Sequence, residues 1–135
     1  MSFTFSTMFP LSRDDTEYEL IEKDYVSLDT FKNKNFLVIH PKALSLITEN
    51  AFYKISHFYR SSHLKLLKNI LDDNEASKND HFVALTMLKN ANISASGVLP
   101  MCQDTGTAII NGYRGKNIVT DFNEEKELSR GIYNS

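Results

Sequence analysis

The residues best suited to chemistry lie together in residues 97–108, GVLPMCQDTGTA. This stretch holds the only cysteine of the sequence, Cys102, followed directly by the carboxamide of Gln103, the carboxylate of Asp104 and the hydroxyl of Thr105. A thiolate is both a nucleophile and a soft metal ligand. The three polar side chains would each need hydrogen-bond partners if they were buried in a core. The composition of the stretch therefore favours a functional site.

Three interpretations of Cys102 stay open on the residues alone. A lone cysteine commonly behaves as a small buried hydrophobe. A catalytic thiol needs a histidine to activate it, and the four histidines, His40, His57, His63 and His81, all lie far from it in the sequence. A thiolate ligand to iron normally acts with further cysteines, and this sequence has no others. The polar neighbours are equally compatible with a solvated turn.

The composition excludes several classes of function. The sequence has 135 residues, with 41% hydrophobic and 24% charged residues, as in an ordinary globular protein. A net charge of -2 without a basic run argues against nucleic-acid binding, and no apolar stretch approaches the length of a membrane span. One cysteine cannot form an internal disulfide, which suits a reducing compartment. The N-terminus resembles neither a signal nor a transit peptide, so we expect a cytoplasmic protein, or a mitochondrial one if a segment precedes it.

The first half of the sequence predicts two strands and a helix. Residues 25–28 read as a short strand, and residues 33–35 as a turn. Residues 36–39 form a continuous apolar run that Pro41 ends, which predicts a buried strand. Apolar residues then recur at helical spacing over residues 42–58, with the proline suited to the first turn.

Two further helices are predicted next. The first begins after Arg60, where Ser61 or Ser62 is suited to cap it, and ends near residues 72–74. The second begins at an N-cap, either Ser77 or Asn79, and runs to about residue 96. Gly97 is then suited to a left-handed helix stop.

The last quarter of the sequence predicts a hairpin and a final helix. Residues 107–110 and 118–120 read as paired strands around a turn at 112–115. Asn123 is a suitable cap for a helix whose first turn is acidic. We therefore expect a helix-rich α/β or α+β fold with a few strands. Because the apolar faces outnumber the elements that could cover them, we infer that much of the partner surface lies outside these residues.

Residues 97–108 resemble the signature of the class I fumarate hydratases, the iron–sulfur fumarases. The resemblance continues in order on both sides, over nearly the whole sequence. It rests on these further residues and segments: 9–11, 15–16, Tyr18, 70–73, 75–77, 79–80, 82–85, 88–91, 128–131 and Tyr133. The shorter core CQDTG also resembles related iron–sulfur hydro-lyases, including the alpha subunit of tartrate dehydratase, but the N-terminal match favours the single-chain fumarase.

The resemblance implies a site and a reaction. In this family three cysteines hold a 4Fe–4S cluster whose fourth iron has no protein ligand and acts as a Lewis acid. Cys102 matches one of these metal ligands. Gln103 and Asp104 match residues that bind the substrate, and Asp104 is also expected to be catalytic, through proton transfer. The implied reaction is the reversible hydration of a small dicarboxylate, fumarate to (S)-malate, in an enzyme expected to be a homodimer.

The sequence departs from the family in places. Ser61 stands where the family often has proline, and Tyr25 where glycine is common. Family members are several times longer, and the other two cluster cysteines belong to regions absent here. Residues 1–135 therefore resemble the N-terminal portion of the fumarase catalytic domain. The alternatives are a tartrate dehydratase-like hydro-lyase and a truncated, non-catalytic fragment. We expect the histidines, Arg114 and Arg130 to have structural or surface roles.

Overall fold

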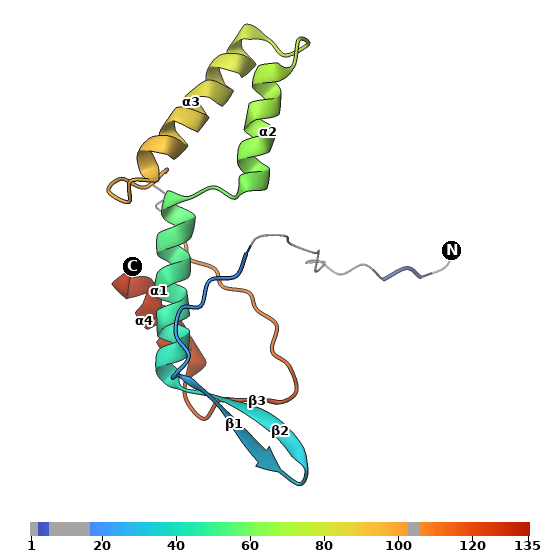
Figure 1. Cartoon of the computed structure of the whole chain (residues 1–135), viewed down its shortest axis with the longest axis vertical. Helices are drawn as coiled ribbons and strands as arrows, with labels where there is room; N and C mark the ends of the chain where they lie inside the picture. The colour runs from blue at the N-terminus through green and yellow to red at the C-terminus, as the bar shows by residue number, and fades with distance from the viewer. Residues whose placement is uncertain (1–2, 6–16, 103–105) are drawn as a thin grey trace.

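The computed structural model describes residues 3–5, 17–102 and 106–135. Helix α1 lies at the centre, with a small sheet near its N-terminal end and a pair of helices beyond its C-terminal end (Figure 1). The elements are β1 (Val26–Phe31), β2 (Lys34–Ile39), α1 (Pro41–His57), α2 (Ser61–Asp72), α3 (Lys78–Ser94), β3 (Ile118–Val119) and α4 (Glu124–Asn134). The expected helix-rich α/β arrangement is confirmed.

Strands β1 and β2 form an antiparallel hairpin with a two-residue turn. Lys32 and Asn33 have φ angles of 48° and 61°. Two positive φ angles in a two-residue hairpin loop match a type I′ turn, whose twist suits the flanking strands. The predicted turn at residues 33–35 was therefore placed slightly late, and β2 begins at Lys34, earlier than expected.

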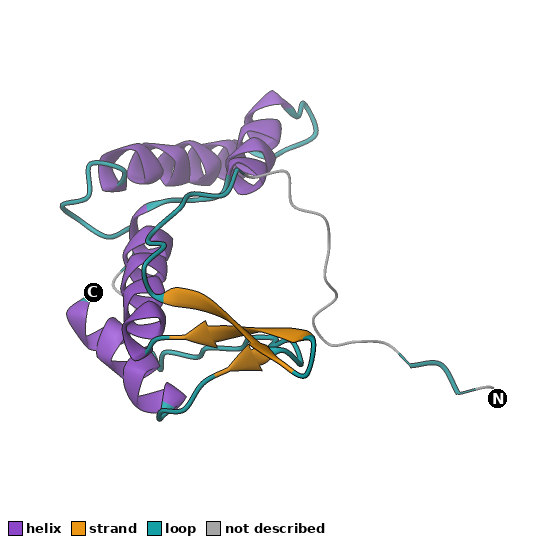
Figure 2. Ribbon diagram, turned by 60° about the horizontal axis from the view of Figure 1, so that its bottom comes forward, coloured by secondary structure: helices purple, strands orange, loops and turns teal. Residues whose placement is uncertain are grey.

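The third strand joins the sheet in a way that the sequence did not indicate. β3 pairs in parallel with β2, with Ile118 opposite Leu37, and the Leu37 N–H donates to the Asn117 carbonyl at 2.9 Å. The predicted hairpin between residues 107–110 and 118–120 is wrong. The chain must return along α1, whose 17 residues span about 25 Å. Covering that distance takes seven or eight extended residues. Residues 107–110, predicted as a strand, belong to this connection, and the segment that leads into β3 is drawn as a loop (Figure 2).

The prediction that residues 36–39 form a buried strand is right for the strand and wrong for the burial. No residue of β2 is buried, and every residue of β1 is exposed. Leu28 and Phe31 are 66% and 65% exposed. The reason is that the described helices pack chiefly on one another, α1 on α4 and α2 on α3, rather than on a face of the sheet. Such exposure is expected for apolar surface that a further partner surface would cover.

The helix ends follow local chemistry at most positions. Ser77 caps α3 in a reciprocal capping box with Asp80, and Asn123 caps α4. Gly97 has a φ of 74° and ends the turn that follows α3, as predicted. The expected serine cap of α2 is wrong, because Arg60 occupies the N-cap and makes no side-chain cap hydrogen bond.

Helices α1 and α4 cross at a glycine. Gly131 is buried, and so are Ser45 and Thr48 on the facing surface of α1. A methyl group added at Gly131 would lie 2.6 Å from Thr48 Cβ and 2.9 Å from Glu49 N, and closer still to the Ser45 carbonyl oxygen. The two backbones therefore approach so closely that a hydrogen is the largest side chain the crossing accepts.

Helices α2 and α3 form the other packed pair. Leu67 of α2 is buried, and so are the small residues Ala84 and Ala91 of α3, which are seven residues apart and so lie on one helix face. Among the helices that the structure describes, none combines the length and apolarity needed to cross a bilayer.

Replacing Gly131 by alanine should destabilise the α1–α4 crossing. Overpacking typically costs about 1–3 kcal/mol. Because the added methyl group would collide with backbone atoms of α1, we expect a cost above the helix propensity of about 1 kcal/mol that alanine gains over glycine. We expect a lower midpoint of thermal unfolding by circular dichroism. Gly112→Ala is the control, since a methyl group there meets nothing within 4 Å. An unchanged or higher midpoint for Gly131→Ala would contradict the close crossing.

The capping box predicts a pH dependence. The Ser77 hydroxyl and backbone N–H both donate to the Asp80 carboxylate, at 2.7 Å and 2.9 Å. These bonds hold the pKa of Asp80 below its ordinary value of 3.8. A carboxyl group whose pKa is lower in the folded state stabilises the fold above its unfolded pKa, and this contribution disappears as the pH falls through the folded pKa.

Ser77→Ala should therefore raise the pKa of Asp80 towards its ordinary value, as an NMR titration of the carboxyl carbon would report. The stability difference between Ser77→Ala and the parent should shrink below about pH 4. Ser62→Ala is the control, because the N-cap of α2 is Arg60. An Asp80 titration that is identical in the parent and in Ser77→Ala would refute the assignment.

Candidate functional site

Cys102 is a free, exposed cysteine at the edge of a cleft of about 570 Å³. The α1 side of this cleft is largely apolar and includes Phe52 and Ile55, and Tyr59 follows just after the helix. Residues 106–109, which follow the site in the sequence, also line the cleft. The interpretation of Cys102 as a buried structural cysteine is therefore wrong. The thiol is open to a ligand.

The residue before the cysteine is held from both sides. The Met101 N–H donates to the carbonyl of Ser56, near the end of α1, at 2.8 Å. The Met101 carbonyl accepts from the Asn90 side-chain amide of α3 at 2.7 Å. The last carbonyls of a helix have no partner within it, so the bond from Met101 satisfies one of these acceptors on α1.

A third contact fixes the start of the same loop. A methyl group added at Gly97 would collide with the hydroxyl of Tyr53, which belongs to α1. The positive φ of Gly97 also disfavours any residue with a side chain. Residues 97–101 therefore lead from α3 to α1 and are held at both ends. Close packing on Tyr53 holds Gly97, and two hydrogen bonds hold Met101.

The other two predicted site residues, Gln103 and Asp104, lie outside the described residues. Within residues 3–5, 17–102 and 106–135, no three histidine, cysteine, aspartate or glutamate side chains come together as a metal-binding group. Among the described residues, the Cys102 thiol thus fits one ligand position of a metal cluster. Any further ligands would come from outside the described residues.

The histidines take part in local structure, as expected. The His40 ring accepts from the Lys42 N–H at 3.2 Å and caps α1. His57 Nδ1 lies 2.8 Å from the carbonyl of Tyr53, one helical turn earlier. The other two also make local contacts, His63 with the Tyr59 ring and His81 with the Asp73 carbonyl.

Arg114 and Arg130 both pair with acidic residues of α4. Arg114 donates to Glu124 at 2.5 Å and to the Thr120 hydroxyl at 3.0 Å. Arg130 lies 3.4 Å from the carboxylate of Glu127. Both arginine side chains remain more than half exposed. These pairings agree with the surface roles expected from the sequence.

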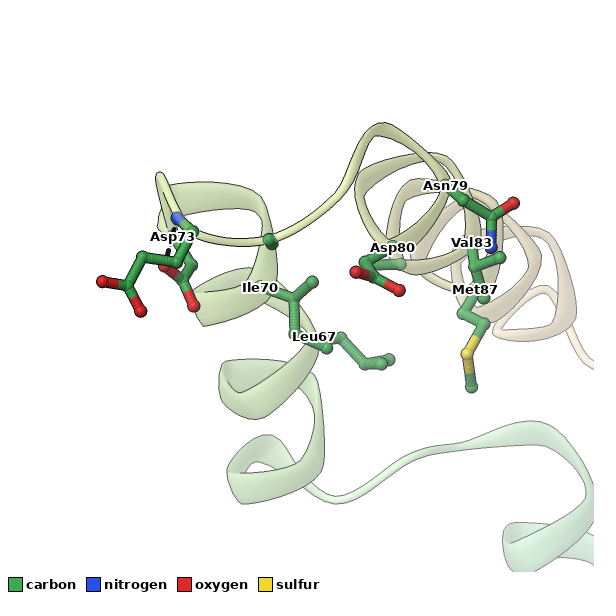
Figure 3. A pocket seen from close by; sticks show the side chains of 10 residues that line it. Leu67, Ile70, Asp73, Asn79, Asp80, Val83 and Met87 are labelled. Carbon is green, nitrogen blue, oxygen red and sulfur yellow. Dashed lines mark hydrogen bonds between the residues drawn. The ribbon is translucent and has the colours of Figure 1, made fainter.

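A second cavity of about 520 Å³ lies between α2 and α3 (Figure 3). Apolar side chains line it from both helices, among them Ile70 and Val83. Asp73, Glu75 and Asp80 add carboxylates, but Asp80 is engaged in the capping box of α3. Cys102 is absent from its lining, so this cavity belongs to the packing of the helix pair.

Sequence reasoning missed the residues that hold the cysteine loop. Asn90 lies in the segment 88–91 that resembles the family, and it is a weak helix former inside a helix, but neither signal pointed to a contact with the cysteine loop. The same helix also contains Asn79 and Asn92, so weak helix propensity does not distinguish among the three. Ser56 contributes only its backbone carbonyl, for which residue type gives no signal at all.

Comparison with known proteins gives a consistent result. A family model described as Fumarate hydratase (Fumerase) matches residues 45–135. The anaerobic class I fumarate hydratase of Escherichia coli K12 is 46% identical over 133 residues, which cover 98% of this chain and 24% of that protein. The aerobic class I enzyme of the same strain is 45% identical over the same length.

A protist relative matches equally well. The mitochondrial fumarate hydratase 1 of Leishmania major is 51% identical over 125 residues, which cover 91% of this chain and 23% of that protein. The chain thus spans about a quarter of the length of the curated relatives it matches. The family model covers most of α1 and everything after it, including Cys102. The chain belongs to the class I fumarate hydratase family.

Proposed function

We propose that residues 1–135 are the N-terminal portion of the catalytic domain of a fumarate hydratase, a hydro-lyase that interconverts fumarate and (S)-malate. The observation that carries the proposal is an exposed cysteine on a doubly held loop, in a chain of this family. The relatives named above are all called fumarate hydratases. This favours fumarate over tartrate as the substrate.

Cys102 is proposed as one of three cysteine ligands of a 4Fe–4S cluster, with the other two outside this chain. When bound, such a cluster with one open iron supplies Lewis acidity towards a hydroxyl leaving group. The exposure of the thiol and the cleft volume of about 570 Å³ leave room for a group of that size.

Gln103 and Asp104 are proposed to contact the substrate, with Asp104 also moving a proton. The proton that must leave malate lies on a carbon next to a carboxylate and is weakly acidic, so a positioned acid–base group is needed. An ionised Asp104 would repel a dicarboxylate, and it must therefore be protonated or hydrogen-bonded when the substrate is present. A cytoplasmic location and a homodimeric assembly remain predictions.

The ligand role of Cys102 is tested in the complete enzyme that contains this chain. Cys102→Ala and Cys102→Ser should lose the cluster and at least about a thousandfold in kcat, since removal of an essential catalytic group commonly costs that much. Iron content, visible absorbance and fumarate hydration under anaerobic conditions are the measurements. Ser62→Ala, on the exposed surface of α2, is the control. An iron-loaded, active Cys102→Ala enzyme would remove Cys102 from the site.

The isolated chain offers a complementary test. One thiolate cannot hold a stable 4Fe–4S cluster, because such clusters are normally held by several cysteines. Residues 1–135 should therefore stay colourless after anaerobic reconstitution with iron and sulfide. A stable cluster absorbance from this chain by itself would show that its own residues complete the ligand set.

A further inference from the structure

The backbone that leads into Cys102 is fixed on both sides of one residue. The peptide unit before Met101 contributes the N–H that bonds to Ser56 of α1. The peptide unit after Met101 contributes the carbonyl that accepts from Asn90 of α3. Because each peptide unit is planar, these two bonds restrain φ and ψ of Met101 together.

The second of these peptide units is also the start of Cys102. The carbonyl of Met101 and the N–H of Cys102 belong to the same rigid plane. The Cα of Cys102 lies in that plane as well. Holding the carbonyl oxygen therefore helps to fix the position of the Cα that carries the thiol. The exposed thiol has no described side-chain partner that could orient it instead.

The chemistry of the contact requires the amide of Asn90. A backbone carbonyl is an acceptor only, so its partner must be a donor. Asn90 and Met101 are both partly buried, so a carbonyl left without this donor would be only incompletely compensated by water. An aspartate has the same shape as asparagine, but when ionised it presents only acceptors to the carbonyl.

We propose that Asn90 is a positioning residue for Cys102. It reaches from α3 to the Met101–Cys102 peptide unit and fixes the position of the Cα that carries the thiol, without touching the metal itself. The proposal rests on the proposed role of Cys102 as a cluster ligand. It adds a residue of the preceding helix that the sequence motif around Cys102 does not contain.

The experiment compares three variants of the complete enzyme, purified without oxygen. Asn90→Ala removes the donor, and Asn90→Asp keeps the shape while removing the donor. Asn92→Ala makes the same substitution at an exposed asparagine of the same helix and serves as the control. The readouts are iron per chain, the rate of cluster loss to a chelator, the electron paramagnetic resonance spectrum of the oxidised cluster, and kcat and KM separately.

Loss of one net hydrogen bond corresponds to about a fivefold change in an equilibrium or a rate. We expect Asn90→Ala and Asn90→Asp to lose the cluster about fivefold faster than Asn92→Ala, with an altered resonance spectrum. We expect kcat to fall in proportion to the loss of iron. Circular dichroism should show the same helix content in all three variants.

Unchanged cluster lifetime and spectrum in Asn90→Asp would overturn the proposal, whether or not Asn90→Ala folds. Failure of both Asn90 variants to fold would assign the residue to the scaffold and would also overturn it. Cys102→Ala separates the two levels of the argument. If that variant loses its cluster while the Asn90 variants keep theirs, the positioning role fails and the proposed function stands. If it keeps its cluster, both fail.

Discussion

The hydrogen bond from Met101 to the end of α1 is the contact on which the candidate site depends. A helix ends with carbonyl groups that need outside donors, and the loop after α3 supplies one to Ser56. The same loop brings Cys102 to the wall formed by α1. A single backbone hydrogen bond thus joins the end of α1 to the loop that follows α3 and carries Cys102. Asn90 of α3 holds the same loop through a second hydrogen bond.

The opposite end of α1 is organised by a steric limit. Gly131 lets α4 lie directly against the backbone of α1, and the short strand before α4 pairs with β2, which leads into α1. The chain therefore contacts α1 near both of its ends, and residues 106–117 lead to β3 in a loop that bows away from the helix (Figure 1). The geometry of the cysteine loop and that of the sheet are linked through a single rigid helix.

The features that the sequence predicted correctly are those determined by neighbouring residues. The caps at Ser77 and Asn123 and the left-handed stop at Gly97 depend on local backbone chemistry, and the structure confirms them. The composition around Cys102 also indicated a site, and the thiol is exposed on a cleft. The roles of Gln103 and Asp104 are predictions that the described residues do not test.

The features that sequence reasoning missed depend on distant parts of the chain. The pairing of Ile118 with Leu37 is set by where α1 leaves the sheet, and no local pattern encodes it. The exposure of β2 depends on which layers are available to cover the sheet, whereas the apolar run predicts only a strand. The bond between Asn90 and Met101 joins a helix to the loop after it, and the residue types alone do not single out Asn90 from the other asparagines of α3.

The parallel pairing of β2 with β3 also has a consequence for the order of folding. The β1–β2 hairpin contains only local contacts, so it can form as soon as its residues are available. The edge of β2 receives β3 only after α1, α2, α3 and the returning segment have been made. Closing so long a loop is slow relative to local folding. During synthesis, one edge of β2 therefore stays open while the region that holds Cys102 emerges, and an open strand edge is where unwanted pairing between chains begins.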